Sequence, residues 1–232
     1  MTATNPTGAD DRPTHRAGPG RLPLLVGSSA ILFSVLYIVS DLIELATGGF
    51  SPVQLVLTYA AEAALPLFVI GLYAVQRPRI GALGLAGAIG YAYSYIAFTA
   101  TVVYSLVEHT RDWVTLTGRL GPWFTAHGVI MVVAGIGFGL AVLRAGVFPR
   151  WTGYALMAGV CLVAATTGLP DVARVLSATV RATAFIGMGV AALRLAGSAA
   201  GSTGRRDSGP APARWAGCGR AGRTGRGVRW RG

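Results

Sequence analysis

Two long apolar runs joined by a short basic link constrain this chain more than any other feature. They occupy residues 120 to 167, and the link between them reads Arg144-Ala-Gly-Val-Phe-Pro-Arg150-Trp151. A helix that crosses a bilayer needs about 20 mostly apolar residues, and each run is long enough. The link can only turn the chain, and its arginines favour the cytoplasmic side of a membrane. The pair therefore predicts a transmembrane hairpin of defined orientation.

The composition agrees with a membrane protein. The 232 residues are 53% hydrophobic and only 12% charged, whereas soluble domains carry about 25% charged residues. The net charge is +11 and every basic residue is arginine. Most of these arginines lie in the tails and short links, where they set topology and meet anionic lipid headgroups. Nucleic acid is therefore a less expected partner than the bilayer.

Apolar periodicity and turn residues divide the chain into six expected spans. We predict an all-α, polytopic bundle over residues 22–196, with spans at about 22–47, 52–76, 81–107, 120–144, 148–167 and 171–195. The first run is too long for a signal-peptide core, so an uncleaved span is expected. The longest external link is residues 108–119. Glycines of the third span, Gly81, Gly84, Gly87 and Gly90, should let a neighbouring helix approach closely.

The distribution of arginine predicts the orientation of these spans. Sixteen arginines fall in the tails and links on one side, while Arg111, Arg119 and Arg174 fall on the other and Arg181 lies within a span. This bias predicts six spans with both tails in the cytoplasm.

Both tails are expected to be disordered, because their polar, Gly- and Pro-rich composition cannot bury a core. They are residues 1–21 and residues 197–232, and the second holds eight arginines against the single acid Asp207. That charge, with Trp215 and Trp230, predicts a tail lying on anionic headgroups. The alternative is a passive extension with no role of its own.

The hairpin segment also resembles a known group of proteins. The residues Leu143-Arg-Ala-Gly-Val-Phe-Pro-Arg-Trp-Thr-Gly153, preceded by Phe124-Thr-Ala-His127-Gly, are similar to the link between the fourth and fifth spans of uncharacterised six-pass bacterial membrane proteins. The resemblance implies a six-helix fold in the bacterial inner membrane. It implies no activity, catalytic residue or cofactor.

Candidate functional residues are the ionisable groups inside the spans, because each costs about 2.5–3.5 kcal/mol at the bilayer centre. Glu62, His127 and Arg181 lie deepest. Glu62 and Arg181 are each about ten residues from the outer end of their spans, or about 15 Å down, so they are expected to pair if their helices are neighbours.

Further polar groups are expected to join this site in the outer half of the bundle. Asp41 and Glu44 share a helix face near the outer end of the first span, and Arg174 lies two turns before Arg181. Pro66 has no N–H for the carbonyl of Glu62, so a kink is expected there. These residues predict either a polar cavity that opens away from the cytoplasm or a structural Glu–Arg lock, in which His127 would be hydrogen-bonded to a backbone group or a Tyr hydroxyl.

Four classes of function remain open at this point. They are a small-solute or ion permease, a non-catalytic structural, sensory or partner-binding module, a membrane-embedded hydrolase or transferase, and a nucleic-acid tether. No HExxH, GxSxG or Walker-type motif occurs, so neither a metal site nor a cofactor is expected. The permease and the structural module are the two hypotheses that the sequence favours.

Overall fold

The computed structural model describes residues 21–166 and 168–204, and the secondary structure in these residues is helical. The all-α class predicted from the sequence is therefore confirmed for this part of the chain. The six helices described there are α1 (Arg21–Thr47), α2 (Pro52–Val75), α3 (Gly81–Val107), α4 (Trp113–Ala145), α5 (Arg150–Ala165) and α6 (Asp171–Gly204).

Five of the described helices, α1, α2, α3, α4 and α6, are long and apolar enough to cross a membrane. Helix α5 has 16 residues, which corresponds to a length of about 24 Å at 1.5 Å per residue. This is shorter than the hydrocarbon core of about 30 Å. The helix is shorter than the fifth expected span, 148–167, because it begins after Pro149 and ends at Ala165, with Thr166 as its C-terminal cap.

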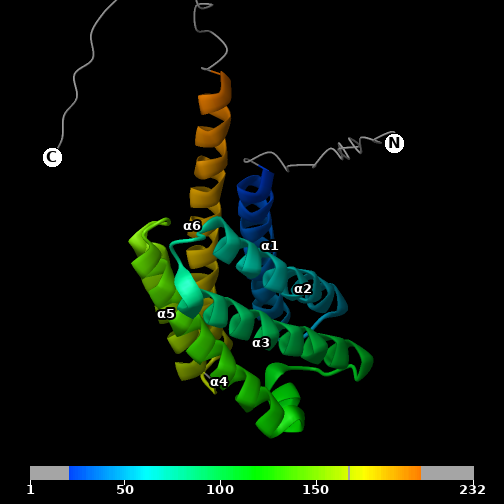
Figure 1. The fold of residues 1–232 in the computed structure, drawn as a ribbon. Coiled ribbons are helices and arrows are strands. Elements are labelled where there is room, and N and C mark those ends of the chain that lie inside the picture. Colours follow the sequence, from blue (N-terminus) through cyan, green and yellow to red (C-terminus); the bar gives the residue numbers. More distant parts are fainter. Residues whose placement is uncertain (1–20, 167, 205–232) are drawn as a thin grey trace, which may run out of the picture.

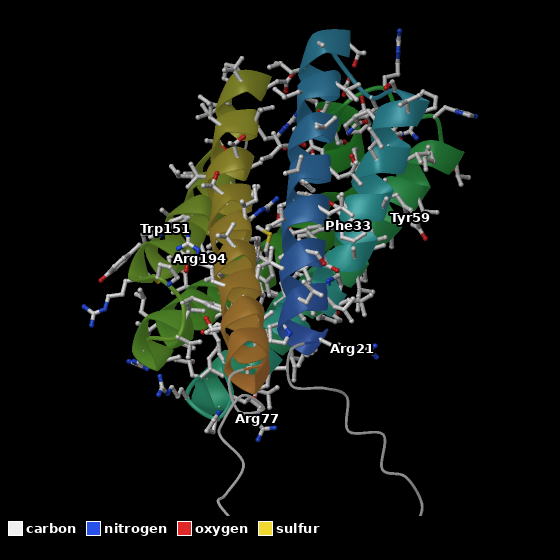
Figure 2. The ribbon with its side chains drawn as sticks, turned by 90° about the horizontal axis from the view of Figure 1, so that it is seen from above. Arg21, Phe33, Tyr59, Arg77, Trp151 and Arg194 are labelled. Atoms are coloured by element: carbon white, nitrogen blue, oxygen red, sulfur yellow. The ribbon has the colours of Figure 1, made fainter. Side chains whose placement is uncertain are left out.

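The helices form a closed ring. Each helix packs against its neighbours in sequence, and α6 returns to pack along α1, so the first and last helices lie side by side (Figures 1 and 2). Helix α2 also touches α6 across the ring, where Phe68 stacks edge-on against Phe185 with 5.4 Å between the ring centres. Arg21 and Arg77 lie at the end of the bundle where α6 finishes (Figure 2), and we call this half the inner half.

Glycine contacts hold the inner half together. A Cβ on Gly139 would lie 2.9 Å from the carbonyl oxygen of Gly153, and one on Gly27 would lie 2.7 Å from that of Gly189. A Cβ on Gly87 would lie 2.6 Å from the backbone nitrogen of Phe138. Only glycine allows backbones this close. The prediction that glycines of the third span admit a neighbouring helix is confirmed at Gly87, which faces α4.

Helix α4 differs most from its prediction. It begins at Trp113, so the residues 113–119 expected as an external link are helical. The carboxylate of Asp112 caps this start by accepting a hydrogen bond of 2.7 Å from the Thr115 N–H. The helix then bends at Gly121, whose φ of 42° and ψ of −120° lie outside the helical region. Glycine tolerates that geometry, and Pro122 follows it.

Two further predictions concern Pro66 and the tails. Helix α2 runs from Pro52 to Val75 through Pro66, and the kink expected there stays a prediction. Helix α6 continues to Gly204, past the span end expected at 195 and into the segment 197–232 expected as a tail. The stretch consists mainly of serine, alanine and glycine, and it contains no proline that would stop a helix. Residues 1–20 and 205–232, with Trp215 and Trp230, lie outside the described residues.

Candidate functional site

A cavity of about 510 Å³ occupies the outer half of the ring, opposite the half that contains the glycine contacts. All six helices contribute to its wall. Five of the six ionisable residues singled out from the sequence line it, and these are Asp41, Glu44, Glu62, Arg174 and Arg181. Apolar and aromatic side chains make up much of the remaining wall. The cavity is thus an amphipathic chamber with its charged groups at defined points.

Glu62 of α2 is the deepest carboxylate in this cavity. Its side chain is 6% exposed, and its Oε2 atom is buried without a hydrogen-bond partner. Within the described part of the chain no Arg or His nitrogen lies within 4.0 Å of its carboxylate. A buried carboxylate normally has a partner, because losing its hydration costs several kcal/mol. Glu62 therefore presents an unsatisfied polar atom to the cavity.

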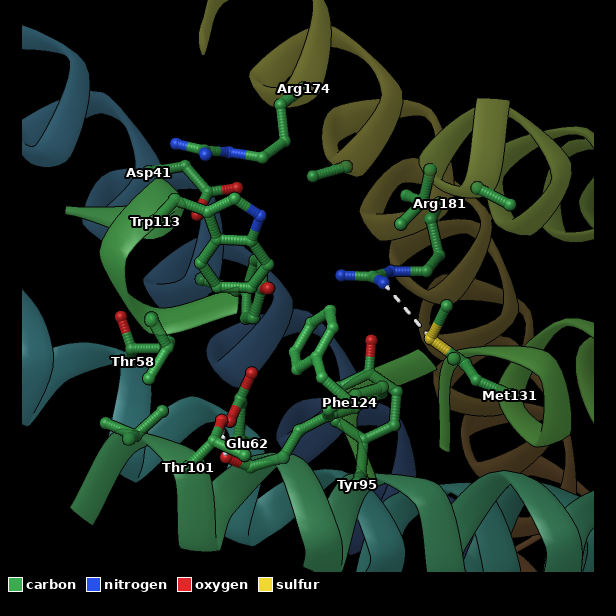
Figure 3. Close-up of a pocket in the computed structure, with 18 of the residues that line it drawn as sticks. Asp41, Thr58, Glu62, Tyr95, Thr101, Trp113, Phe124, Met131, Arg174 and Arg181 are labelled. Atoms are coloured by element: carbon green, nitrogen blue, oxygen red, sulfur yellow. Dashed lines mark hydrogen bonds between the residues drawn. The ribbon is translucent and has the colours of Figure 1, made fainter. Parts of the chain in front are cut away.

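Arg181 of α6 extends into the same space (Figure 3). It is 4% exposed. Its guanidinium carbon lies 5.1 Å from the centre of the Tyr37 ring and 5.4 Å from that of Tyr95, and Nη1 lies 3.8 Å from the sulfur of Met131. These contacts are cation–π and sulfur interactions.

The ion pair expected between Glu62 and Arg181 is not formed. The two residues line one cavity, as their similar depth predicted, but no carboxylate of the described residues lies within 4.0 Å of the Arg181 guanidinium. The guanidinium is held by the Tyr37 and Tyr95 rings instead. The lock predicted between these two residues is therefore absent from the structure.

A different ion pair closes the outer end of the bundle. Arg174 of α6 forms a salt bridge with Glu44 of α1, and its second partner is Asp171 at 3.1 Å. Gln54 of α2 donates to the other oxygen of Glu44 at 3.5 Å. The Arg174 guanidinium also lies 5.1 Å from the centre of the Trp113 ring. This cluster joins α1, α2, α4 and α6, so Arg174 and Glu44 already have partners.

Asp41 lines the cavity one helical turn before Glu44 and is partly exposed. Nearby, hydroxyl groups join α1 to α2: Ser40 bonds Thr58 and donates to the carbonyl of Gln54 at 3.1 Å. The outer half is therefore held together mainly by polar side chains, in contrast to the glycine contacts of the inner half.

His127 does not join the cavity. Its side chain is 5% exposed, and its Nδ1 lies 2.8 Å from the carbonyl oxygen of Trp123, to which it donates. Its Nε2 lies 3.3 Å from the hydroxyl of Tyr93, which then donates to it. The sequence placed His127 at a suitable depth, but its position around α4 directs it toward α3. Its hydrogen bonds satisfy both ring nitrogens within the packing.

The structure adds aromatic residues that the sequence did not assign to a site. Tyr37 lies four residues before Asp41 and seven before Glu44, and all three line the cavity. That spacing places them on one helix face, so periodicity could have found Tyr37. Tyr95 and Trp113 carry no comparable signal, because only the packing of α3 and α4 shows which way they face.

Among the described residues, no group of three or more His, Cys, Asp or Glu side chains gathers in a way that would hold a metal ion. No family model, curated protein or solved structure matches this chain. In the described part of the chain, the cavity is therefore the feature that bears on function.

Proposed function

We propose that this protein is a multi-pass protein of the bacterial inner membrane with six spans and both tails in the cytoplasm. The arginine bias between the two ends of the bundle supports this orientation. The path of the chain supports six spans, because Thr166, which follows α5, lines the same outer cavity as Glu44 at the end of α1. Helix α5 thus returns the chain to the outer end despite its 16 residues.

Cysteine labelling tests this topology. Gly118→Cys and Ala82→Cys are suitable sites because both residues are exposed and lie at opposite ends of the bundle. In a background without Cys161 and Cys218, a membrane-impermeant maleimide added to the outside of intact cells should label the first variant and spare the second. Labelling of Ala82→Cys alone would reverse the proposed orientation.

We further propose that the bundle binds and passes a small solute or ion, as a permease does. The main support for this proposal is that the buried Oε2 atom of Glu62 has no hydrogen-bond partner and faces a cavity. The cavity is large enough for a ligand, because binding pockets typically measure about 300–1,000 Å³. Ionisable groups that face a cavity inside a membrane commonly mark substrate paths. The close inner half would form the closed gate of such a path.

Swelling of proteoliposomes tests this function. Vesicles with the purified protein are diluted into glycine, tetramethylammonium chloride or erythritol, which represent zwitterions, cations and neutral solutes. At least one solute should enter faster than into empty vesicles, and Glu62→Gln should abolish the difference without lowering the thermal midpoint. Thr183→Val, an exposed change on α6 away from the cavity, is the control. Swelling equal to that of empty vesicles for all three solutes would contradict the permease.

The second candidate is a non-catalytic structural module, which the Glu44–Arg174 salt bridge favours. In that case the charged residues only fix the order of the helices. Glu62→Gln would then change the thermal midpoint and leave swelling at the level of empty vesicles. The same pair of measurements therefore separates the two functions.

A further inference from the structure

Among the described residues that line the cavity, the exposed ones gather on one side of the ring. Of the residues that line it, four are exposed: Thr125, Val129 and Val133 of α4, and Ala164 of α5. Val129 is 58% and Val133 67% exposed, and the three α4 residues are spaced four apart, so they share one face. The opening thus lies between the outer parts of α4 and α5 and faces sideways, where a spanning bundle meets lipid.

The outer end of the cavity is covered. Leu116, from the short helical segment before Gly121, is 2% exposed. Trp113 of the same segment packs edge-on against Phe124, with 5.1 Å between ring centres, and against Phe50 at 6.3 Å. The Arg174 guanidinium lies against Trp113. These contacts form a roof toward the outer aqueous side, so the sideways opening is the accessible one.

Glycine packing explains why α4 and α5 leave this opening. A Cβ on Gly139 would lie 2.7 Å from a carbon of Met157, and one on Gly135 would lie 2.8 Å from a methyl group of Val160, so the inner parts of the two helices touch. A Cβ on Gly128, two turns further out on α4, would meet nothing within 4 Å. Helix α5 ends at Ala165, while α4 continues outward to the roof.

Inside the cavity, three charged groups of the described residues have no ionic partner within 4.0 Å, and they are the carboxylates of Asp41 and Glu62 and the guanidinium of Arg181. Glu62 and Arg181 are buried and both face the cavity (Figure 3), whereas Asp41 is partly exposed. A simple cation would satisfy Glu62 but be repelled by Arg181, and a simple anion would meet the reverse problem. A zwitterion satisfies both. The rings of Phe98 and Phe124, 5.3 Å apart, line the same space and suit a quaternary ammonium group.

We infer that this cavity takes the headgroup of a single-chain zwitterionic amphiphile, which enters from the membrane between α4 and α5. Its anionic group faces Arg181, its cationic group faces Glu62, and its chain lies along Val129 and Val133 in the opening. This assignment rests on the proposed function, because it names the ligand of the same cavity. It adds the class of ligand and the route of entry.

Fluorescence quenching of Trp113 tests the inference. The full chain keeps Trp113 as its one tryptophan, the other four being replaced by Phe, and is placed in nanodiscs of phosphatidylglycerol. The probe is a lysophosphatidylcholine brominated near the headgroup end of its chain. Two comparison probes carry the same chain on a maltoside or a trimethylammonium headgroup. The phosphocholine probe should quench Trp113 saturably, and the other two should quench it only in proportion to their concentration in the membrane.

Variants distinguish the site from general lipid contact. Glu62→Gln and Arg181→Gln should each remove the saturable part of the quenching. Val133→Phe, which narrows the opening, should weaken it, whereas Ile130→Phe, an exposed α4 position outside the cavity wall, should leave it unchanged. Equal quenching by all three headgroups, or equal effects of the two phenylalanine variants, would overturn the inference even if Arg181→Gln does not fold.

A chain-free headgroup separates this inference from the proposed function. Glycerophosphocholine carries the same charges without the acyl chain. If it shifts Trp113 emission while the lysolipid does not quench, lateral entry is wrong and a solute site remains. If neither probe acts and no solute enters proteoliposomes, the inference and the proposed function both fail. Saturable lysolipid quenching without solute entry supports the inference and contradicts the permease.

Discussion

The two halves of this bundle are built by opposite means. In the inner half, helices meet through glycines, as at Gly27 and Gly189 or Gly139 and Gly153, where the backbones are in direct contact. In the outer half, α1, α2 and α6 are joined by a salt bridge and hydroxyl groups, and the ring encloses about 510 Å³.

This difference separates the packing that holds the bundle together from the cavity and its charged residues. The hydrophobic effect does not drive helices together in lipid, so close packing between backbones has to stabilise a bundle there. The glycine contacts supply that packing at one end. The other end can then keep charged residues and empty volume, which a tightly packed bundle would exclude. Each half can be altered separately, and the following changes test that separation.

The largest effect should come from filling an inner glycine contact. Gly87→Leu places a side chain where a Cβ already lies 2.6 Å from the backbone nitrogen of Phe138. No rotamer relieves a clash with backbone, so we expect a loss of about 3 kcal/mol, at the upper end for overpacking. Unfolding by sodium dodecyl sulfate in mixed micelles measures it. Gly137→Leu, whose Cβ would meet only Leu83 at 3.8 Å, is the control.

The next effect should come from the outer salt bridge. Arg174→Gln removes the partner of Glu44, whose side chain is 11% exposed. We expect a loss of about 2 kcal/mol, the scale for a hydrogen bond to a charged group. Arg119→Gln breaks an ion pair whose side chains are both 48% exposed, so it should cost about 0–1 kcal/mol. Equal losses in the two variants would show that the Glu44 cluster does not hold the outer half.

A smaller loss of stability should come from a substitution at Gly159, where glycine packing meets the cavity residue Arg181. In Gly159→Ala, the new methyl group would lie 2.7 Å from Cα, Cβ and the backbone nitrogen of Arg181. We expect a net loss of about 1 kcal/mol, since alanine partly compensates through its helix propensity. The displaced Arg181 should reduce solute entry into proteoliposomes more than it reduces stability. Gly118→Ala, with no neighbour within 4 Å of its Cβ, should affect neither.

The smallest effect should be the pH dependence of the roof segment. The backbone N–H of Thr115 donates to Asp112 and lowers the pKa of its carboxyl below the usual value. Because the folded pKa is the lower one, this stabilisation is present above about pH 4 and is lost as pH falls through the folded pKa. Asp112→Asn keeps a capping oxygen and should remove the pH dependence of the thermal midpoint in this range. An unchanged profile would contradict the cap.

The positions of α1, α2 and α3 followed closely from the sequence because the length of each apolar run and the turn residues between the runs determine them. The predicted span 81–107 matches α3, and 22–47 differs from α1 by one residue. The prediction that residues 113–119 form a link is wrong, because they are polar enough to resemble one. Their helix depends on the Asp112 cap, on the packing of Trp113 against aromatic rings and on the burial of Leu116, which hydropathy does not report.

The candidate site followed from the sequence only in part. Counting residues along a helix gives depth, and depth correctly grouped Glu62 with Arg181 in one cavity. It does not give the direction in which a side chain points between helices. For that reason the sequence left two hypotheses for His127, a place in the cavity or a hydrogen bond to a backbone group or a Tyr hydroxyl, and the structure shows the second. The salt bridge expected at Glu62 forms at Glu44 instead.

Cysteine reactivity compares the two halves most directly. In a background without Cys161 and Cys218, Thr101→Cys places a thiol in the outer cavity and Ala141→Cys places one in the inner packing, both at positions at most 5% exposed. The membrane-permeant reagent N-ethylmaleimide reaches the protein from either side. We predict that it modifies Thr101→Cys in the folded protein and modifies Ala141→Cys only after unfolding. Equal protection of both thiols in the folded protein would contradict a hollow outer half over a closed inner half.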